Sequence, residues 1–390
     1  MKIALYVHDL FIEIGHSNAL IEQVNNFPED KIKKIYIFVY SYGDLKILFP
    51  NLNKKTKVIQ IPFPNIKPFI IKELWYLLFT FFYNIFFLSK QVIKIGIGTA
   101  CFNVDISNVQ FVHSDWKKMY FESTKFSFIQ YLYKKILFLY FDIIEYLFFH
   151  NTKKLIICLS KFVKDYIQDH YKVPSNNLSL VYSSTNMERF KLIEKTKIEL
   201  INSLSSEFPD LLNLDTAKPI YLFIGAFERK GGPDVIKSLK NIQNIKDAQL
   251  IIVGKTSDNR EIKSFNNLNI IHIQFTNRLQ EIYSLADCFV FPTIYEPFGL
   301  VITEAAAMGL QLIVTKNKVG ASEILHDLKE IYLVDSPDNL PVEKARVLSI
   351  SEKLNLIKER REVFEKYNWS YAGKKLFDLC SEIKNTQTPK

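Results

Sequence analysis

FPTIYEPFGLVITEAAAMGLQLIVTKNKVGASEIL, residues 291–325, places two glutamates around a short apolar helix. The run CFVFPT that leads into it is rich in residues that favour a buried strand, and Pro297 suits the first turn of a helix. The stretch is therefore predicted to pass from a strand through a short loop into a helix that begins at Pro297. The free backbone N–H groups and the positive dipole end of such a helix can receive an anion.

Glu296 and Glu304 are the two carboxylates of this stretch. On a continuous helix they would be separated by about 12 Å and would lie on nearly the same side. That separation is close to the length of a sugar, a diphosphate and a ribose joined together. Two carboxylates that bind hydroxyl groups on either side of the phosphates would therefore suit a nucleotide-sugar. The alternative is an amphipathic helix with two solvated glutamates.

Short β-branched runs alternate with helical patterns along the chain, from KIALYV at residues 2–7 to EIYLVD at residues 330–335. Such alternation predicts an α/β protein with parallel sheets and helices on both faces. The series pauses before Pro219 and restarts at IYLFIG. We therefore predict a first Rossmann-like domain over 1–187, a hinge over 188–218, a second Rossmann-like domain over 219–366 and a final helical segment over 367–390.

The composition describes a globular chain of two domains. It has 390 residues, of which 48% are hydrophobic, and this content excludes general disorder. The four cysteines are scattered and form no C-x-x-C pair. This pattern suits a reducing compartment, and it disfavours a zinc site. The N-terminal apolar run is too short for a signal peptide, so the chain is expected in the cytoplasm, with the cytoplasmic face of the inner membrane left open.

The positive charge is concentrated in the first half. Residues 1–190 carry 23 Lys and Arg against 15 Asp and Glu, whereas residues 191–390 carry 27 against 26. The same half holds two aromatic-rich stretches, 69–88 and 126–149, both interrupted by charges and too short to predict a membrane span. They are interpreted either as packing helices or as helices in peripheral contact with an anionic membrane. Nucleic acid is not expected as a partner, since no binding motif or long Lys/Arg run is present.

GAFERKGG, residues 225–232, follows the first predicted strand of the second domain. Arg229 and Lys230 could neutralise a departing diphosphate, the first as a fork of donors and the second as a point charge. Gly231 and Gly232 would allow a close backbone approach. The alternative is an exposed basic turn.

These motifs resemble the retaining, family-4 glycosyltransferases of GT-B fold, in which two Rossmann-like domains with parallel sheets face a central cleft. E-P-F-G-L-x-x-x-E-A-x-A-x-G after an apolar strand is the most specific part, and the compact R-K-G turn is similar to that of lipopolysaccharide-core members. The resemblance covers most of residues 95–380 and is strongest between 220 and 325. It implies that the first domain binds the acceptor, that the second binds the nucleotide-sugar and that the final helix crosses back to the first domain.

The resemblance also implies roles for individual residues. Glu296 would contact the donor sugar and Glu304 the ribose, and Arg229 and Lys230 would face the diphosphate. The other residues with implied donor contacts are the amides of Phe298, Gly299 and Leu300, the base-bordering Phe275 or Thr276, the sugar-contacting His113 and, in the N-terminal loop, Gly15. His113 is predicted to end the apolar strand of VQFVHSDW, with a purely structural histidine as the alternative, and Phe275 could equally be an ordinary core residue. The family's usual glycine pair is here Ile14–Gly15.

The expected reaction is transfer of a hexose, with a UDP-sugar as the favoured donor, to a glycan or lipid-linked acceptor of a bacterial envelope polysaccharide or lipopolysaccharide. Cations and N–H donors would stabilise the departing diphosphate while hydrogen bonds hold the sugar. No cofactor or metal is expected, because the D-x-D and H-E-x-x-H signatures are absent. The alternatives are a nucleotide-sugar epimerase of the same architecture and a non-catalytic glycan- or membrane-binding scaffold. An NAD-linked protein is disfavoured because GIGTAC, residues 96–101, ends in Cys where the dinucleotide motif has Gly.

Overall fold

The computed structural model describes residues 1–63, 69–124, 127–150, 152–242, 248–256 and 268–387. The chain forms two compact units. Unit 1 consists of Met1–Ser183 together with Trp369–Lys390, and unit 2 is Ser184–Asn368. Residues 188–218, which the sequence predicts as a hinge, belong to unit 2, and the C-terminal segment belongs to unit 1.

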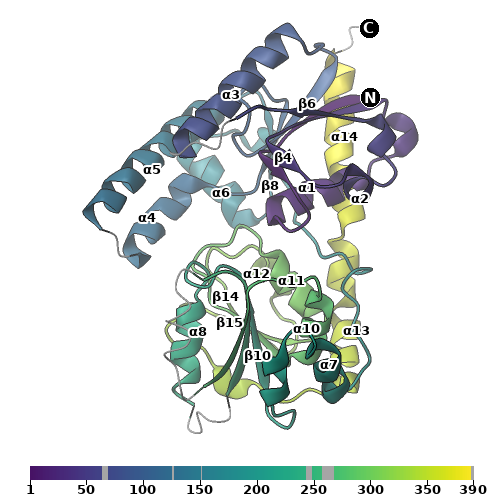
Figure 1. The fold of residues 1–390 in the computed structure, drawn as a ribbon. Helices are drawn as coiled ribbons and strands as arrows, with labels where there is room; N and C mark the ends of the chain where they lie inside the picture. The colour runs from purple at the N-terminus through teal and green to yellow at the C-terminus, as the bar shows by residue number, and fades with distance from the viewer. Residues whose placement is uncertain (64–68, 125–126, 151, 243–247, 257–267, 388–390) are drawn as a thin grey trace. The chain divides into compact units, whose positions relative to one another are not determined.

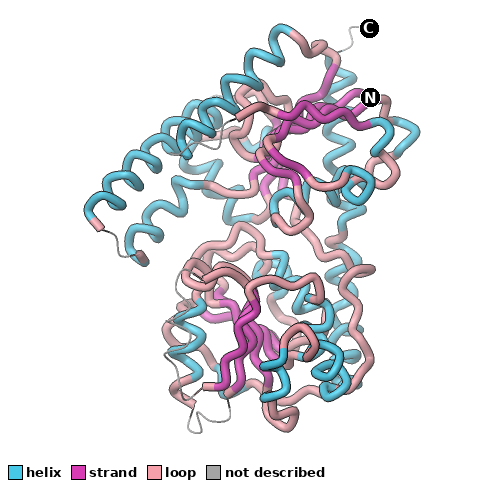
Figure 2. The backbone as a smooth tube through the Cα atoms, viewed as in Figure 1, coloured by secondary structure: helices cyan, strands magenta, loops and turns pink. Residues whose placement is uncertain are grey.

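Unit 1 is built on a seven-stranded sheet in which each neighbouring pair of strands is parallel (Figures 1 and 2). Its strand order is β5 (Thr56–Gln60), β3 (Lys34–Val39), β1 (Lys2–Tyr6), β6 (Val92–Ile97), β7 (Ile106–Val109), β8 (Leu155–Cys158) and β9 (Leu178–Leu180). A small additional sheet pairs β2 (Asp9–Leu10) with β4 (Ser41–Tyr42). The helices of this unit are α1 (Gly15–Asn25), α2 (Leu45–Leu48), α3 (Phe69–Phe86), α4 (His113–Ser123), α5 (Phe128–Phe149), α6 (Lys161–Tyr171) and α14 (Trp369–Gln387).

The last helix closes unit 1 by packing on α1. The ring of Phe377 contacts that of Phe27 with centroids 5.5 Å apart. Gly373 permits the close approach, because a Cβ atom at that position would lie 2.5 Å from the carbonyl oxygen of Gln23. Leu376 and Cys380 are fully buried beneath the helix. The end of the chain therefore supplies part of the core of the first unit.

Unit 2 is built on a six-stranded parallel sheet. Its strand order is β12 (Asn269–Ile273), β11 (Gln249–Val253), β10 (Ile220–Ile224), β13 (Cys288–Phe291), β14 (Gln311–Thr315) and β15 (Ile331–Val334). The helices are α7 (Lys197–Leu204), α8 (Gly232–Leu239), α10 (Leu279–Leu285), α11 (Leu300–Ala307), α12 (Ser322–Leu325) and α13 (Ile350–Lys366). In Figure 1, α8 lies on one side of the sheet and α10 and α11 lie on the other. Strands β10, β11, β13 and β14 are buried at every residue, as expected of continuous apolar runs in a sheet covered on both faces.

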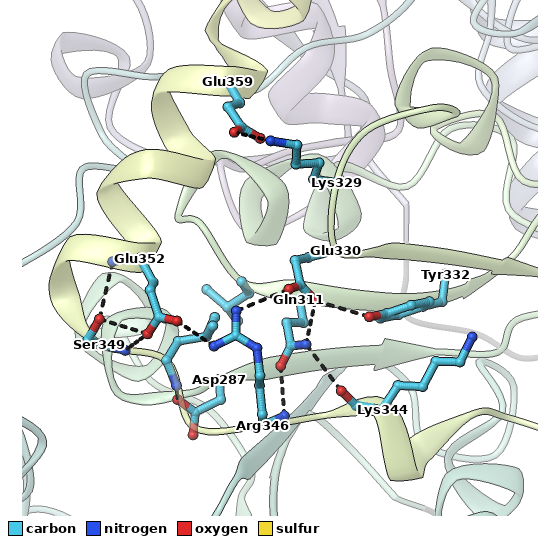
Figure 3. Close-up of polar contacts among 12 residues, drawn as sticks. Asp287, Gln311, Lys329, Glu330, Tyr332, Lys344, Arg346, Ser349, Glu352 and Glu359 are labelled. Atoms are coloured by element: carbon cyan, nitrogen blue, oxygen red, sulfur yellow. Dashed lines mark hydrogen bonds and ion pairs between the residues drawn. The ribbon is translucent and has the colours of Figure 1, made fainter.

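A polar network stabilises the amino ends of these strands (Figure 3). Glu330, next to the start of β15, accepts hydrogen bonds from Gln311 at 2.7 Å, from Tyr332 at 3.0 Å and from Arg346 at 3.1 Å. Asp287, next to the start of β13, accepts from the backbone N–H groups of Ile220 and Leu348, both at 2.9 Å. These side chains satisfy strand ends and are structural. The opposite, carboxyl edge of the sheet is where an α/β protein binds its ligand.

Candidate active site

The order of strands in unit 2 reverses between β10 and β13, and this switch point is where a doubly wound sheet opens a crevice for a ligand. Two loops leave the sheet there. One is residues 225–232 after β10, and the other is residues 292–299 after β13. The two motifs singled out in the sequence therefore lie on neighbouring strands at one edge of one sheet.

Lys230 and Glu296 meet at this edge. The Nζ atom of Lys230 forms an ion pair and hydrogen bond with a carboxylate oxygen of Glu296. The Lys230 side chain is 8% exposed and that of Glu296 is 19% exposed. Burial lowers the pKa of Lys230, while the Glu296 carboxylate opposes that effect. Two residues predicted to act on different parts of a donor are therefore in direct contact.

Arg229 differs from its neighbour, since its side chain is exposed. Its positive charge lies close enough to Lys230 to contribute to the lowering of the Lys230 pKa. The R-K pair thus offers one buried and one exposed cation. Either could meet a phosphate that enters from solvent.

Gly231 determines how the basic loop lies on the sheet. It adopts φ +85°, and a Cβ atom there would lie 2.6 Å from the carbonyl oxygen of Pro292. The next residue, Gly232, begins α8 and packs under the ring of Phe227. The close backbone approach expected at these glycines is therefore an approach to the neighbouring loop.

The helix after Glu296 begins later than the sequence predicts. α11 starts at Leu300, preceded by Gly299 at φ +97°, so the prediction of a start at Pro297 is wrong. Glu296 instead forms a parallel bridge with Val319, and its N–H donates to the carbonyl of Lys318 at 2.9 Å. The two glutamates consequently do not share one continuous helix, and the helical estimate of their separation does not apply. The amides of Phe298, Gly299 and Leu300 do lie in the turn that leads into α11.

Glu304 lies within α11 and is held by one phenol. The hydroxyl of Tyr283 donates to its carboxylate at 2.9 Å. Burial raises the pKa of Glu304 to about 7, although the hydrogen bond from Tyr283 and the charge of Arg189 act in the opposite direction. A carboxylate with spare acceptor capacity in a desolvated position is suited to hydroxyl groups of a ligand.

Phe275 and Thr276 follow β12 at the same edge. Phe275 is 60% exposed, so the alternative that it is an ordinary core residue is wrong. Thr276 is buried, and its hydroxyl accepts from the N–H of Arg278 at 2.9 Å. An exposed aromatic ring is available for stacking, whereas the Thr276 side chain is engaged in the turn.

His113 belongs to unit 1, and its local structure differs from the prediction. The strand of VQFVHSDW ends at Val109, and His113 is the first residue of α4. Its ring stacks on Phe141 with centroids 3.7 Å apart, and its side chain is 30% exposed. The His113 side chain is therefore only partly exposed to solvent, and its stacking on Phe141 orients the ring.

Glu145, which the sequence interpretation missed, anchors His113. The α5 carboxylate accepts from the backbone N–H groups of His113 at 2.7 Å and Ser114 at 3.1 Å, from the His113 ring at 3.0 Å and from Tyr171 at 2.9 Å. Burial alone would raise the pKa of Glu145, but the hydrogen bonds and charge of His113 outweigh it and hold that pKa below its ordinary value. An ionised carboxylate only accepts, so Nδ1 of His113 carries the proton and Nε2 is left for a ligand.

Gly15 begins α1, and a Cβ atom there would meet nothing within 4 Å. The glycine therefore faces open space in unit 1. The adjacent His16 is desolvated, and burial lowers its pKa to about 4. It stays neutral at physiological pH.

A polar and aromatic cavity lies in unit 1, at the carboxyl ends of β3 and β5. It has a volume of about 970 Å³. Lys72 in its wall lies 3.8 Å from Asp9 and 4.7 Å from the ring centroid of Tyr40. The lining residues are Asp9, Tyr40, Ser41, Gln60, Ile61, Pro62, Phe63, Lys72 and Trp75. No motif in the sequence indicated it, because its walls come from segments far apart in the chain.

Within the described ranges, no group of three or more His, Cys, Asp or Glu residues is placed to hold a metal ion. The four cysteines are free thiols, and all are buried. In the same ranges, α3 is the one helix whose length and composition would allow it to cross a membrane.

Comparison with known proteins defines the class of unit 2. Residues 206–368 match the family model of glycosyl transferases group 1, so unit 2 carries a group 1 glycosyltransferase domain. An uncharacterized glycosyltransferase of Methanocaldococcus jannaschii is 27% identical over 236 residues, which cover 57% of this chain and 59% of the relative. A second one from the same organism is 25% identical over 50% of this chain and 46% of its own length. The chain thus matches about half the length of these curated relatives.

Solved structures define the fold of the whole chain as GT-B. WaaG, a glycosyltransferase involved in lipopolysaccharide biosynthesis, superposes with a TM-score of 0.69 at 15% identity and full coverage of both chains. HepE of Anabaena, solved with UDP and glucose, has a TM-score of 0.67 at 12% identity over 98% of this chain and 100% of its own. The prediction of an α/β GT-B protein with two Rossmann-like domains is confirmed.

Proposed function

We propose that the chain is a retaining, metal-independent glycosyltransferase that moves a hexose from a UDP-sugar to a glycan or lipid-linked acceptor of a bacterial envelope. The observation that carries the proposal is the contact between Lys230 and Glu296 at the switch point of a group 1 glycosyltransferase domain. The fold shared with HepE, which was solved with UDP and glucose, favours UDP as the nucleotide.

Each side chain has one task in this scheme. The bond between the anomeric carbon and the β-phosphate oxygen breaks, a bond to an acceptor oxygen forms on the same face, and the leaving phosphate takes the acceptor's proton. Lys230, Arg229 and the amides before α11 stabilise the charge that develops on the diphosphate. Glu296 holds hydroxyl groups of the sugar. For His113 of unit 1, the family resemblance implies a sugar contact, for which the Glu145 contact described above leaves Nε2 available. The cations of the chain supply the positive charge, so the scheme requires no metal.

The Lys230–Glu296 pair prepares the site before the donor arrives. Burial lowers the pKa of Lys230, and the Glu296 carboxylate counteracts this effect. An incoming diphosphate would share Lys230 with Glu296 and free one carboxylate oxygen for the sugar. Binding energy is then available where charge develops during the reaction.

We place the nucleotide end of the donor at Glu304 and Phe275. Glu304 would accept hydrogen bonds from the ribose, and the exposed ring of Phe275 would border the base. The acceptor is assigned to the cavity of unit 1. Its Trp75, Tyr40 and Phe63 rings could stack on sugar faces, while Asp9, Gln60 and Lys72 bond hydroxyl or anionic groups.

The test is a donor screen followed by turnover. Purified chain is incubated with UDP-, GDP- and other nucleotide-sugars, and release of nucleoside diphosphate is measured with and without candidate acceptors. A donor that stabilises the protein and is consumed only with acceptor supports the proposal. Glu296→Gln should lower the rate at least about 100-fold, as expected for loss of a charged contact in the transition state. Glu362→Gln, on the exposed face of α13, is the matched control and should keep full activity.

Other results would contradict it. Conversion of a nucleotide-sugar into its epimer without acceptor would assign an epimerase. Binding without turnover for every donor and acceptor would assign a scaffold. Full activity of the Glu296 variant would remove the proposed site.

A further inference from the structure

The outward face of α3 is apolar along its whole length. Seven large side chains on it are between 41% and 70% exposed: Ile71, Leu74, Trp75, Leu78, Phe82, Ile85 and Phe86. Their spacing of three, four and seven residues follows one side of a helix. A helix on the surface of a water-soluble domain carries polar residues on that side.

The inward face of α3 carries polar groups instead. Tyr76 is fully buried, and its hydroxyl donates to the carbonyls of Phe38 at 2.7 Å and Val7 at 3.1 Å. Thr80 and Asn84 are also buried, and Asn84 accepts from the hydroxyl of Tyr6. The protein side of α3 thus mixes polar groups with apolar ones such as Leu77, whereas its solvent side carries large apolar side chains. Such a pattern suits a helix with the domain on one side and an apolar medium on the other.

α5 repeats the pattern. Its exposed stripe is Ile129, Leu132, Ile136, Leu139, Ile143 and Leu147, each between 49% and 80% exposed. Its inward face is mainly apolar, with buried side chains such as Phe138 and Phe148, and it also holds the hydrogen-bonded carboxylate of Glu145. Two helices of unit 1 thus each present an apolar stripe to solvent.

The two stripes belong to one region of unit 1. Tyr76 of α3 and Phe148 and Phe149 of α5 belong to one buried hydrophobic cluster. Figures 1 and 2 show α3, α4 and α5 extending together from one side of the first sheet. Large apolar side chains at half exposure leave on the order of 100 Å² each, so each stripe by itself exceeds the few hundred Å² that water-soluble monomers commonly expose in one patch. We name the thirteen residues of the two stripes the apolar surface.

The charge of unit 1 selects the kind of partner. Unit 1 contains 26 Lys and Arg against 16 Asp and Glu, whereas unit 2 contains 24 against 25. The unit that bears the apolar surface thus carries the positive charge of the protein. Lys90, Lys118 and Lys135 are exposed next to or on these helices. A second copy of the chain would bring the same positive charge and be repelled, whereas anionic lipid headgroups are attracted.

The helices lie on the bilayer and do not cross it. α3 is 18 residues long, and its inward side carries the hydrogen-bonded polar groups of Tyr76 and Asn84. That side is hydrogen-bonded to β1 and β3, so crossing would pull Tyr76 and Asn84 out of the core into hydrocarbon. An interfacial helix instead buries its apolar side about 5–10 Å deep while the other side stays on the protein.

We propose that unit 1 docks on an anionic lipid bilayer through the apolar surface of α3 and α5. Insertion at headgroup level brings the acceptor cavity, which Trp75 of α3 also lines, to the membrane surface. Binding to lipid is a property separate from glycosyl transfer and can be measured without any substrate.

The test is co-sedimentation of the full chain with vesicles of phosphatidylcholine alone and with about one-third phosphatidylglycerol. Anionic vesicles should bind the protein more tightly, and added salt should weaken binding without abolishing it, because the apolar contact is not screened. Leu78→Asp with Phe82→Asp on α3, and Leu139→Asp with Ile143→Asp on α5, should each lower the partition constant at least about tenfold. Ile198→Asp with Leu212→Asp is the matched control, since these residues of unit 2 are 61% and 60% exposed. It should bind like the parent chain.

Trp75 gives a second readout that does not depend on charge. Its fluorescence should shift to the blue with anionic vesicles, and the shift should vanish in Trp75→Phe. Equal binding by the stripe variants and the parent would overturn the proposal. So would a lipid-free dimer in analytical ultracentrifugation that the stripe variants abolish, since that result would assign the surface to a second copy. Circular dichroism of each variant confirms that it is folded before either result is used.

Discussion

Glu304 is the residue whose protonation should link the stability of unit 2 to the proposed binding of the nucleotide. Its pKa is raised by burial to about 7 from an ordinary 4.5. Because the folded-state pKa is raised, its contribution to stability is fully present below pH 4.5 and is lost as pH rises through about 7. Keeping this carboxylate ionised therefore costs the fold about 3 kcal/mol at pH 8, a cost that is understandable if a ligand needs the charge.

Glu304→Gln should stabilise the unliganded protein at high pH. The amide oxygen can still accept from Tyr283, and the variant has no charge to desolvate. Its free energy of unfolding should exceed that of the parent by about 3 kcal/mol at pH 8 and by much less at pH 5, measured by urea denaturation. The same variant should bind UDP more weakly at pH 8. Parent binding should weaken as pH falls below 7, while the variant shows no such dependence; identical pH profiles would contradict the ribose role.

Glu145→Gln tests the anchor of His113. The side-chain amide nitrogen of the new glutamine would face N–H donors. The buried site would also lose a carboxylate that accepts four hydrogen bonds. Loss of about 3 kcal/mol of stability is expected. The Glu145 pKa is lowered in the fold, so the stability it contributes is present above pH 4.5 and is lost as pH falls through its folded value. The variant should show less destabilisation by acid than the parent, together with a changed pH profile of turnover because the tautomer of His113 is no longer fixed.

At the scale of elements, local patterns predicted strands well and helix starts poorly. The apolar runs at β10, β11, β13 and β14 predict buried parallel strands, because both faces of such strands are covered along their whole length. The starts of α4 and α11 depend on partners far away in the chain. Glu145 supplies acceptors to the start of α4 from 32 residues away, and Val319 draws Glu296 into a bridge. Neither contact has a local signal.

In the candidate site, too, some features follow from local sequence patterns, whereas others depend on contacts between distant segments. The positions of the basic loop and of the Glu pair on adjacent strands could be predicted, because strand order at a switch point brings such loops together. The direct pairing of Lys230 with Glu296 could not, since it depends on the backbone path through Gly231. The cavity of unit 1 also escaped prediction, because its walls are assembled by tertiary packing.

Gly231→Ala should disrupt the loop that carries Lys230. The new Cβ would meet the carbonyl oxygen of Pro292 at 2.6 Å, and φ +85° is unfavourable for alanine. We expect a loss of about 3 kcal/mol or more in thermal or chemical denaturation, with weakened UDP binding. Gly98→Ala is the matched control. It has φ +53° and no atom within 4 Å of the new Cβ, so it should lose only about 1 kcal/mol. Similar losses in both variants would show that the approach to Pro292 does not matter.

At the scale of the whole molecule, the two units differ in the number of chain segments that build them. Unit 2 is one uninterrupted segment, Ser184–Asn368, whereas unit 1 needs both ends of the chain. The charges are divided as well, with the positive excess in unit 1. The proposed membrane docking of unit 1 and the proposed nucleotide binding of unit 2 place different demands on surface composition, and the two units could meet these demands separately.

This division predicts different results for two truncations. Residues 184–368 expressed alone should fold, because their sheet, its helices and the Asp287 and Glu330 networks are internal to the segment. The fragment should bind UDP by calorimetry, with Glu304→Gln weakening binding as in the full chain. Residues 1–368, by contrast, should unfold in unit 1, since loss of α14 uncovers Phe27 and the end of α1, against which Phe377 and Gly373 pack. Native-state hydrogen exchange should then show protection confined to 184–368. Full protection of α1 without α14, or a fragment 184–368 that is unfolded, would refute the independence of the two units.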